Sequence, residues 1–211
     1  MKTAETKLAE KFAVIPNDDV IAKTMEALKA NGIDAVVVEN GAEAKAKVLE
    51  MIPEGAEVMN MTSVTLDTIS VSEAILNSGK YKPSRTKLYD PNASPKEKLI
   101  AGAVPDYSLA SVHAVTEDGK LMIASNTGSQ LPAVAYSSPH VILVVGAQKI
   151  VQDIDQGFKR IYDYVLPLES VRANKAYNIT HGSFVSKLLI INRELNKERI
   201  KVILVKEVLG F

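Results

Sequence analysis

Three segments of the chain carry side chains that could hold an anion together. Hydroxyl and amide groups donate and accept hydrogen bonds, and a lysine adds a positive charge. The first segment follows the apolar run that ends at residue 61, the second is the polar stretch 125–130, and the third is residues 146–149. We expect them to bind a small anionic ligand through Asn60, Ser63, Thr65, Asn126, Thr127, Gly128, Ser129, Gln130 and Lys149.

The polar stretch also has a simpler interpretation. Residues 125–130 are Ser, Asn, Thr, Gly, Ser and Gln, and turn residues of these types can satisfy their own backbone. Against this, Gly128 would let the backbone approach a ligand closely. In the first segment, Thr62, Ser63 or Thr65 could simply cap a helix, which is compatible with anion binding by free backbone amides. Both interpretations stay open at this point.

Lys149 carries the expected positive charge of the site. It follows an apolar run and stands near the predicted start of a helix, where the helix dipole disfavours a cation by about 0.3–1 kcal/mol. An anion bound nearby would offset that cost. The alternatives are that Lys149 is solvated, or that it forms an exposed ion pair with Asp153, four residues further on.

The other residues with reactive side chains show no such pattern. His113 lies in a predicted strand without a partner that would define a mechanism, so a structural or exposed role is expected. His140 and His181 lack the carboxylate spacing of a metal site. Glu169 and Arg172 are spaced i and i+3, which predicts a pair on a helix surface. No Gly-rich dinucleotide motif, P-loop or hydrolase elbow is present, so neither a metal nor a cofactor is expected.

Composition excludes several classes of protein. Lys plus Arg and Asp plus Glu both number 25, so the chain has no basic footprint for nucleic acid. It has no cysteine, which excludes disulfides, thiolate nucleophiles and cysteine-held iron–sulfur clusters. The amino-terminal residues lack an apolar signal core, and no run reaches the ~18 apolar residues of a membrane span. We expect a cytoplasmic protein that forms one domain over residues 1–211.

Apolar runs and amphipathic segments alternate along the first part of the chain. A helix is predicted over 18–32, capped by Asn17, and others over 41–51 and 62–79; apolar strands are predicted over 34–39 and 56–61. This alternation favours an α/β fold with a mainly parallel, Rossmann-like sheet flanked by helices. In such sheets ligands bind beyond the carboxyl ends of the strands, where the three polar segments are expected to converge.

The amino-terminal residues and the second half of the chain contain further predicted helices and strands. A short helix over 3–12 predicts a helical extension within residues 1–16, and a short strand is predicted over 87–89. Ser94 and Pro95 predict a helix start. Residues 108–125 predict a hairpin around Asp118-Gly119, which would add an antiparallel element to the sheet. Further elements are a strand that starts at residue 140 and ends at Gly146, an amphipathic helix over 151–166 that Pro167 ends, a second short helix over 167–177, and strands over 187–192 and 200–209.

Several stretches together resemble the LUD (lactate-utilisation) domain family. They are VMNMTSVTLD, HAVTEDGKLMIASNTGSQLPAVAY, VILVVGAQKIVQDIDQGFKRIYDYVLPLESVRA and IKVILVKEVLGF, and the likeness extends over about residues 18–211. The resemblance implies the fold of the superfamily of ribose-phosphate isomerases, glucosamine-phosphate deaminases and coenzyme A transferases. It also implies a link to the oxidation of lactate to pyruvate, with partner subunits that carry iron–sulfur clusters.

The chain departs from parts of that family. One branch has a cysteine-rich segment near its carboxyl end, and it has Asp and Arg where this chain has Ser125 and Gln130. Coenzyme A transferases use a glutamate nucleophile, and Glu117, the nearest counterpart, stands in a turn, so transferase activity does not carry over. We therefore expect an anion-binding protein that binds a hydroxy acid or a sugar phosphate. The alternatives are a non-catalytic subunit docked onto an iron–sulfur oxidoreductase, and an isomerase or transferase; a homodimer is the default assembly.

Overall fold

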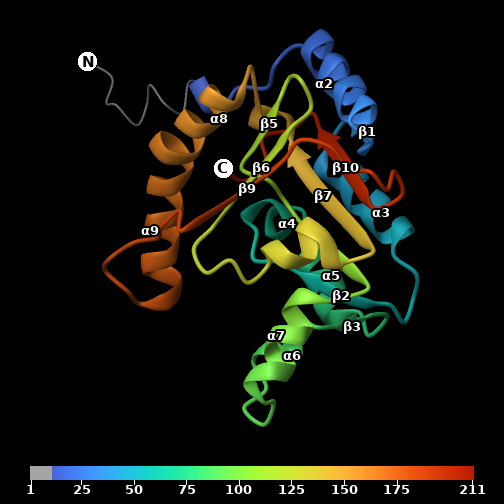
Figure 1. Cartoon of the computed structure of the whole chain (residues 1–211), viewed down its shortest axis with the longest axis vertical. Helices are drawn as coiled ribbons and strands as arrows, with labels where there is room; N and C mark the ends of the chain where they lie inside the picture. Colours follow the sequence, from blue (N-terminus) through green and yellow to red (C-terminus); the bar gives the residue numbers. More distant parts are fainter. Residues whose placement is uncertain (1–10) are drawn as a thin grey trace.

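Six parallel strands form the main sheet of the protein (Figure 1). The structure is a computed structural model, which describes residues 11–211. Every neighbouring pair in the sheet runs parallel. The strand order is β1 (Asp34–Val38), β10 (Ile200–Val205), β7 (His140–Gly146), β4 (Tyr107–Ala110), β2 (Glu57–Asn60) and β3 (Lys82–Pro83). The predicted parallel α/β sheet is confirmed.

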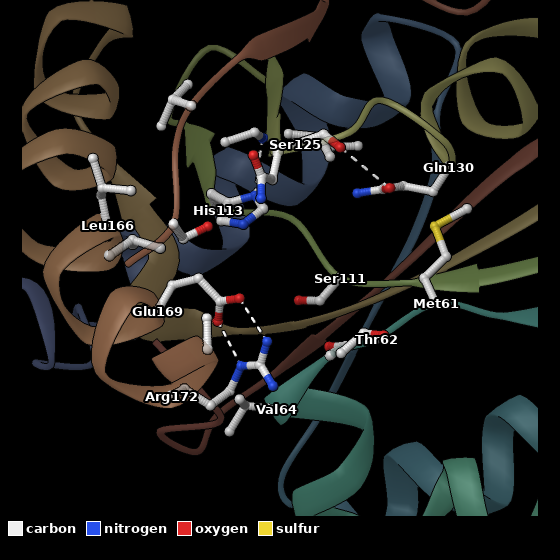
Figure 2. Close-up of a pocket in the computed structure, with 18 of the residues that line it drawn as sticks. Met61, Thr62, Val64, Ser111, His113, Ser125, Gln130, Leu166, Glu169 and Arg172 are labelled. Carbon is white, nitrogen blue, oxygen red and sulfur yellow. Dashed lines mark hydrogen bonds and ion pairs between the residues drawn. The ribbon is translucent and has the colours of Figure 1, made fainter. Parts of the chain in front are cut away.

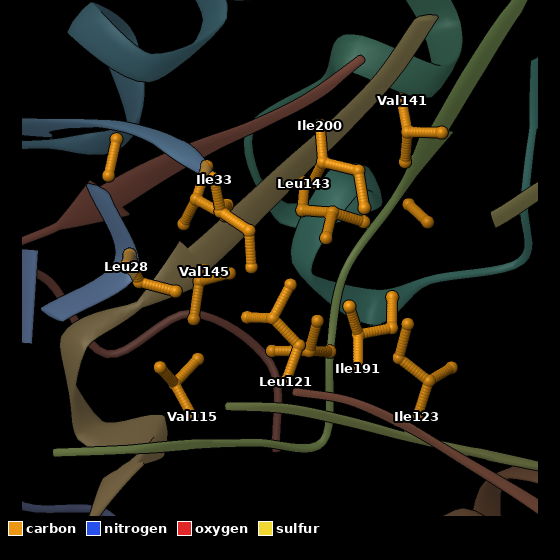
Figure 3. Close-up of a cluster of buried hydrophobic side chains, with 14 of the residues drawn as sticks. Leu28, Ile33, Val115, Leu121, Ile123, Val141, Leu143, Val145, Ile191 and Ile200 are labelled. Atoms are coloured by element: carbon orange, nitrogen blue, oxygen red, sulfur yellow. The ribbon is translucent and has the colours of Figure 1, made fainter. Parts of the chain in front are cut away.

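Helices and a second sheet cover the two faces of the main sheet. On one face, α3 (Gly41–Met51), α4 (Val64–Thr68) and α5 (Val71–Asn77) pack into a cluster with Ile142, Val144 and Ile203. On the other face, α2 (Asp18–Ala30) packs with the second sheet over Leu143 and Val145 (Figure 3). Successive residues of β7 thus point into different clusters, which explains why the central strands read as unbroken apolar runs.

Of the hairpin predicted over 108–125, only residues 114–125 form one, in a second sheet, whereas residues 107–110 form β4 of the main sheet. The second sheet has the order β8 (Ile150–Val151), β5 (Ala114–Thr116), β6 (Leu121–Ser125) and β9 (Lys187–Ile191). Strand β6 is antiparallel to β5 and β9, whereas β8 is parallel to β5. The predicted antiparallel element is confirmed, but it packs on a face of the parallel sheet and does not join it. Val115 and Leu121 pack towards the main sheet, while Ala114 and Met122 pack towards α8 (Ile154–Lys159).

One long helical segment follows β8. It consists of α8, the π-helical turn η3 (Arg160–Val165) and α9 (Leu166–Tyr177). The second helix predicted over 167–177 is present as α9, but Pro167 does not end the helical segment, contrary to expectation. Pro167 lies in the first turn of α9, directly after the wider π turn, in which the Leu166 amide bonds to the carbonyl of Ile161 five residues back. Proline is tolerated at such a helix start because its missing N–H group is not needed there.

The remaining elements lie at the edge of the main sheet. The strand predicted over 87–89 was wrong: these residues fall in and after the short helix α6 (Arg85–Leu88), and the strand is β3, which precedes it. The predicted helix start at Ser94 and Pro95 is confirmed, with a full capping box in α7 (Pro95–Ala103). The short π-helix η1 (Ala133–Ser137) follows the polar loop. The helix predicted over 3–12 lies outside the described residues, apart from Lys11 and Phe12, which are helical.

Among the described residues, none of the helices has both the length and the apolar character that crossing a bilayer requires.

Candidate functional site

A cavity of about 470 Å³ lies between the carboxyl ends of the main-sheet strands and the helical segment η3–α9 (Figure 2). All three polar segments singled out in the sequence reach it. Of the residues expected to bind the ligand, the structure places these around the cavity: Ser63, Thr65, Asn126, Thr127, Ser129, Gln130 and Lys149. The convergence follows from the parallel sheet, because the carboxyl ends of its strands meet at one edge.

Two of the expected residues do not line the cavity. Asn60 is buried at the end of β2, and its Oδ1 atom has no hydrogen-bond partner among residues 11–211. Gly128 forms the back of the polar loop, where φ is +82° and an added Cβ would collide with the side chain of Lys187. Gly128 therefore shapes the loop, and the idea that its backbone approaches a ligand gains no support from this position.

We expect Gly128→Ala to lower the free energy of unfolding by about 1–2 kcal/mol, because a β-carbon at positive φ is strained, while the exposed side chain of Lys187 can move aside. Gly79→Ala is the matched control. Gly79 has φ +72°, but nothing lies within 4 Å of an added Cβ, so it reports the backbone strain alone. Urea unfolding of both variants should give similar losses, and no loss in Gly128→Ala would contradict the strain assigned to this position.

Lys149 lies inside the protein, at the end of the 3₁₀ turn η2 (Ala147–Lys149). The expectation that it stands at a helix start was wrong, and so were both alternatives: its exposed fraction is 2 %, and Asp153 instead caps α8. The Lys149 Nζ atom donates hydrogen bonds to Thr65 Oγ1 at 2.9 Å, to Ser111 Oγ at 3.1 Å and to the Val112 carbonyl at 3.2 Å. Lys149 thus joins the segments that follow β2 and β4.

The three hydrogen-bond partners of Lys149 are neutral oxygen atoms, which suit a protonated ammonium group but do not balance its charge. The Thr65 hydroxyl donates its own proton to the Leu209 carbonyl, so it must accept from Lys149. Three acceptors therefore face the three protons of an ammonium. Burial, and secondly the charge of Arg160, lower the pKa of Lys149 well below its ordinary value. No carboxylate of residues 11–211 forms an ion pair with it.

Arg160 is a second buried cation, and it contacts the backbone of His113. The guanidinium of Arg160 donates to the carbonyl of His113 at 2.6 Å and to that of Phe12 at 3.4 Å, and it lies 5.4 Å from the ring centre of Tyr164. Burial lowers its pKa to about 10. Arg160 likewise forms no ion pair with a carboxylate of the described part of the chain. Two positive charges therefore stand near each other without a described negative partner.

His113 lines the cavity, and it also has the structural contact that the sequence left open for it. Its Nδ1 atom accepts a hydrogen bond from the Ala124 amide at 3.0 Å, which places the ring proton on Nε2. Burial, the charge of Lys149 and that of Arg160, in this order, lower the pKa of His113 to about 3. The ring is therefore neutral at physiological pH. Its Nε2–H group has no hydrogen-bond partner among the described residues and is free to donate to a ligand.

The polar loop satisfies part of its own hydrogen bonding and still lines the cavity, so its two interpretations coexist. The Ser125 hydroxyl accepts from the Gly128 amide at 2.8 Å and donates to Gln130 Oε1 at 3.2 Å (Figure 2). The Thr127 and Ser129 hydroxyls bond to each other at 3.0 Å. Because its oxygen is occupied, Gln130 presents its amide N–H groups, which are donors. Ser63 caps α4, as the simpler interpretation predicted.

An ion pair on α9 forms the opposite wall (Figure 2). Glu169 accepts two hydrogen bonds from Arg172, both of 2.6 Å, and this pairing raises the pKa of Arg172. The predicted i, i+3 pair on a helix surface is present, and that surface of α9 faces the cavity. A signal was available in the sequence: the apolar stripe through Ile161 and Val165 continues, at i+4 and i+7, to Glu169 and Arg172. The prediction that the helix ends at Pro167 meant that the stripe was not followed to Glu169 and Arg172.

Comparisons with known proteins agree with this architecture. The crystal structure of a DUF162 family protein from Deinococcus radiodurans is similar, with a TM-score of 0.54 and 12% identity, over 90% of this chain and 99% of that chain; at this identity the likeness shows the fold alone. No curated protein matches the chain in sequence. The model of the LUD domain matches residues 21–205, which include every residue placed around the cavity in the three polar segments. The chain belongs to the LUD domain family.

Proposed function

We propose that this LUD-family protein, whose family is linked to lactate utilisation, binds a small organic anion in the cavity at the carboxyl ends of its strands. The ligand is a hydroxy acid, such as lactate, or a sugar phosphate. This proposal makes binding the primary activity of the site and assigns no catalytic group.

The observation that carries the proposal is the buried ammonium of Lys149 without a counter-ion among the described residues. An unpaired charge in a protein interior is costly, and a protein relieves the cost by deprotonation or by taking up an opposite charge. Three hydrogen bonds to neutral oxygens favour the protonated form. An anion in the cavity would supply the missing charge, and it would also be attracted by Arg160, behind His113.

Hydrogen-bond donors around the cavity suit the same ligand. His113 contributes its Nε2–H group and Gln130 its side-chain amide. Ser111 accepts from Lys149, and its own proton has only a long contact of 3.4 Å with the Val112 carbonyl, so it can turn towards a ligand. Charge-assisted donors of this kind bind carboxylates and phosphates more strongly than neutral ones do.

Calorimetric titration with lactate, pyruvate, ribose 5-phosphate and inorganic phosphate tests the proposal. We expect binding of at least one of them, weakened about tenfold in a Ser111→Ala, Gln130→Leu double variant, because each lost donor contributes about 0.5–1.5 kcal/mol. If none of the four anions binds the parent protein, or if the double variant binds as tightly as the parent, the proposed site is wrong.

Chemistry of the isomerase or transferase kind finds less support. Lys149 has a shifted pKa and faces the cavity, but its Nζ atom is enclosed by three acceptors, which leaves it poorly placed as a nucleophile. Glu117, the nearest counterpart of the transferase nucleophile, forms an ion pair with Lys23 and does not line the cavity. These contacts favour a binding role over group transfer.

A second proposal is that the protein also docks onto an iron–sulfur oxidoreductase, as the family resemblance implies. The observation that favours it is a group of exposed apolar side chains on and beside α7, namely Leu99, Ile100, Val104 and Tyr136. Exposed groups of this kind often mark protein interfaces. Co-purification with a cluster-bearing subunit, lost in Leu99→Ser, would support docking. A complex of twice the 22.8 kDa chain mass would indicate a homodimer instead.

A further inference from the structure

The cavity is much larger than a three-carbon acid. Its volume is about 470 Å³. Lactate has six heavy atoms, and six water molecules, at roughly 30 Å³ each, would fill only about 180 Å³. Cavities of about 300–1,000 Å³ are typical of sites for larger organic ligands. A ligand that fills this cavity therefore has a body in addition to its anionic group.

The two ends of the cavity differ in chemistry. At the end formed by the main-sheet strands, Ser111, His113 and Lys149 provide donors and a positive charge. The wall formed by η3 and α9 combines the apolar side chains of Val165 and Leu166 with the ion pair of Glu169 and Arg172, whose charges compensate each other. Figure 2 labels Leu166, Glu169 and Arg172 on this wall. An anionic group matches the first end, whereas the second end offers no uncompensated positive charge and suits the body of a ligand.

Three aromatic side chains that line the cavity remain largely exposed, and we call them the aromatic rim. They are Tyr89, Tyr177 and Phe184, with exposed fractions of 70 %, 58 % and 53 %. Tyr89 follows α6, Tyr177 ends α9, and Phe184 lies in the segment before β9. Large aromatic groups left exposed together at a cavity are typical of binding sites.

A planar partner holds each ring of the aromatic rim from one side. The guanidinium carbons of Arg85 and Arg172 lie 5.7 Å and 5.6 Å from the ring centres of Tyr89 and Tyr177. His181 stacks on Phe184, with centres 5.7 Å apart and an interplanar angle of 19°. Such contacts fix the orientation of the rings before a ligand arrives, which lowers the entropic cost of stacking on them. The exposed fractions show that much of each ring is still open to solvent.

We propose that the ligand is an organic anion that carries a planar ring, with its anionic group against Lys149 and His113 and its ring stacked on the aromatic rim. This inference rests on the proposed function, since it assumes that the anionic group binds at the strand ends. It adds a second subsite, made of residues that the polar segments do not contain, and it narrows the ligand to a class of compounds.

Matched pairs of anions test the ring subsite. The probes are inorganic phosphate against phenyl phosphate and pyruvate against phenylpyruvate, titrated into the full chain by calorimetry. We expect the ring-bearing member of a pair to bind about tenfold more tightly, within the range that stacking on an aromatic side chain gives. In a Tyr177→Ala, Phe184→Ala double variant, the affinity ratio within each pair should fall to near one.

Leu195→Ala is the control variant. Leu195 is an exposed apolar residue in the loop that leads into the amino end of β10, away from the cavity lining, so its variant should keep the full ratio. Thermal unfolding identifies variants that fail to fold. If the double variant does so, Tyr89→Ala alone takes its place, with a smaller but definite fall in the ratio expected.

The outcomes separate this inference from the proposed function. If no member of either pair binds, and lactate and ribose 5-phosphate do not bind either, the anion site itself is wrong. If both members bind with equal affinity, the anion site stands and the ring subsite is overturned. A preference for the ring that persists in the folded rim variants would also overturn it, because the ring would then bind elsewhere in the cavity.

Discussion

Replacing Lys149 by methionine is expected to weaken anion binding about a hundredfold and to leave the protein at least as stable as the parent. At a separation of roughly 5 Å and an effective dielectric constant of about 20, the attraction between a lysine and an anion is about 3 kcal/mol. The burial of Lys149 limits screening by salt, so the loss should persist at moderate ionic strength. Calorimetry with phosphate and pyruvate measures it.

The stability of Lys149→Met distinguishes a binding residue from a structural one. The substitution relieves the burial of a charge, while Thr65, Ser111 and the Val112 carbonyl can bond to water in the cavity instead. Lys80→Met is the control, because Lys80 is exposed, pairs with Glu54 and does not line the cavity. A fall of several kcal/mol in the free energy of unfolding of Lys149→Met would contradict the binding role and indicate that Lys149 mainly holds the segments together.

The pH dependence of Lys149 has a definite sign. Its folded-state pKa lies below the value of 10.5 expected in the unfolded chain, so between the two the unfolded state holds more protons. The free energy of unfolding of the ligand-free parent should therefore rise with pH across this interval, and Lys149→Met should lose that slope. A bound anion raises the pKa again, so anion binding should take up protons at alkaline pH.

His113 is expected to make the protein sensitive to acid. Its pKa is about 3 in the folded protein, against 6.5 in the unfolded chain. Its contribution to stability is therefore complete above pH 6.5 and is lost as the pH falls towards 3. At pH 4.5 the lowered pKa would reduce the free energy of unfolding by about 3 kcal/mol at most. The cavity hydrates the ring and weakens this effect, so we expect a reduction of about 1–3 kcal/mol.

Urea unfolding at pH 7 and pH 4.5 checks this expectation. The loss of unfolding free energy between the two values should be about 1–3 kcal/mol smaller in His113→Gln than in the parent. Carboxylates also titrate in this range, but their contribution is common to both proteins and cancels in the comparison. His181→Gln, at an exposed histidine, is the control and should lose as much as the parent. If His113→Gln loses as much unfolding free energy between pH 7 and pH 4.5 as the parent does, the ring of His113 is not kept neutral by its surroundings.

Much of the main sheet could be predicted from local pattern. The unbroken apolar runs of β1, β7 and β10 indicated strands buried on both faces, and the amphipathic segments between strands became α2 and α3. Caps predicted from single residues, such as Asn17 and Ser94, are present. These features depend on neighbours in the chain, so the sequence encodes them directly.

The errors arose where distant contacts decide the structure. The hairpin left the parallel sheet because Ala114 and Met122 pack against α8 and η3, whereas Val115 and Leu121 pack against the main sheet. Pro167 continues the helix because the preceding π turn accommodates it. Neither arrangement has a local signal, since alternation along a strand shows that both faces are covered but not by which element.

The sequence by itself determined the family, the parallel α/β sheet and the edge at which three distant polar segments meet, because periodicity and strand direction follow from the order of residues along the chain. Only the tertiary structure decided which side chains face the cavity. Lys149 points inward to three oxygen acceptors, His113 is held neutral by its surroundings, and α9 places Glu169 and Arg172 on the wall of the same cavity. Burial, charge and pKa depend on elements that come together only in the folded chain, so the chemistry of the site is a property of its packing.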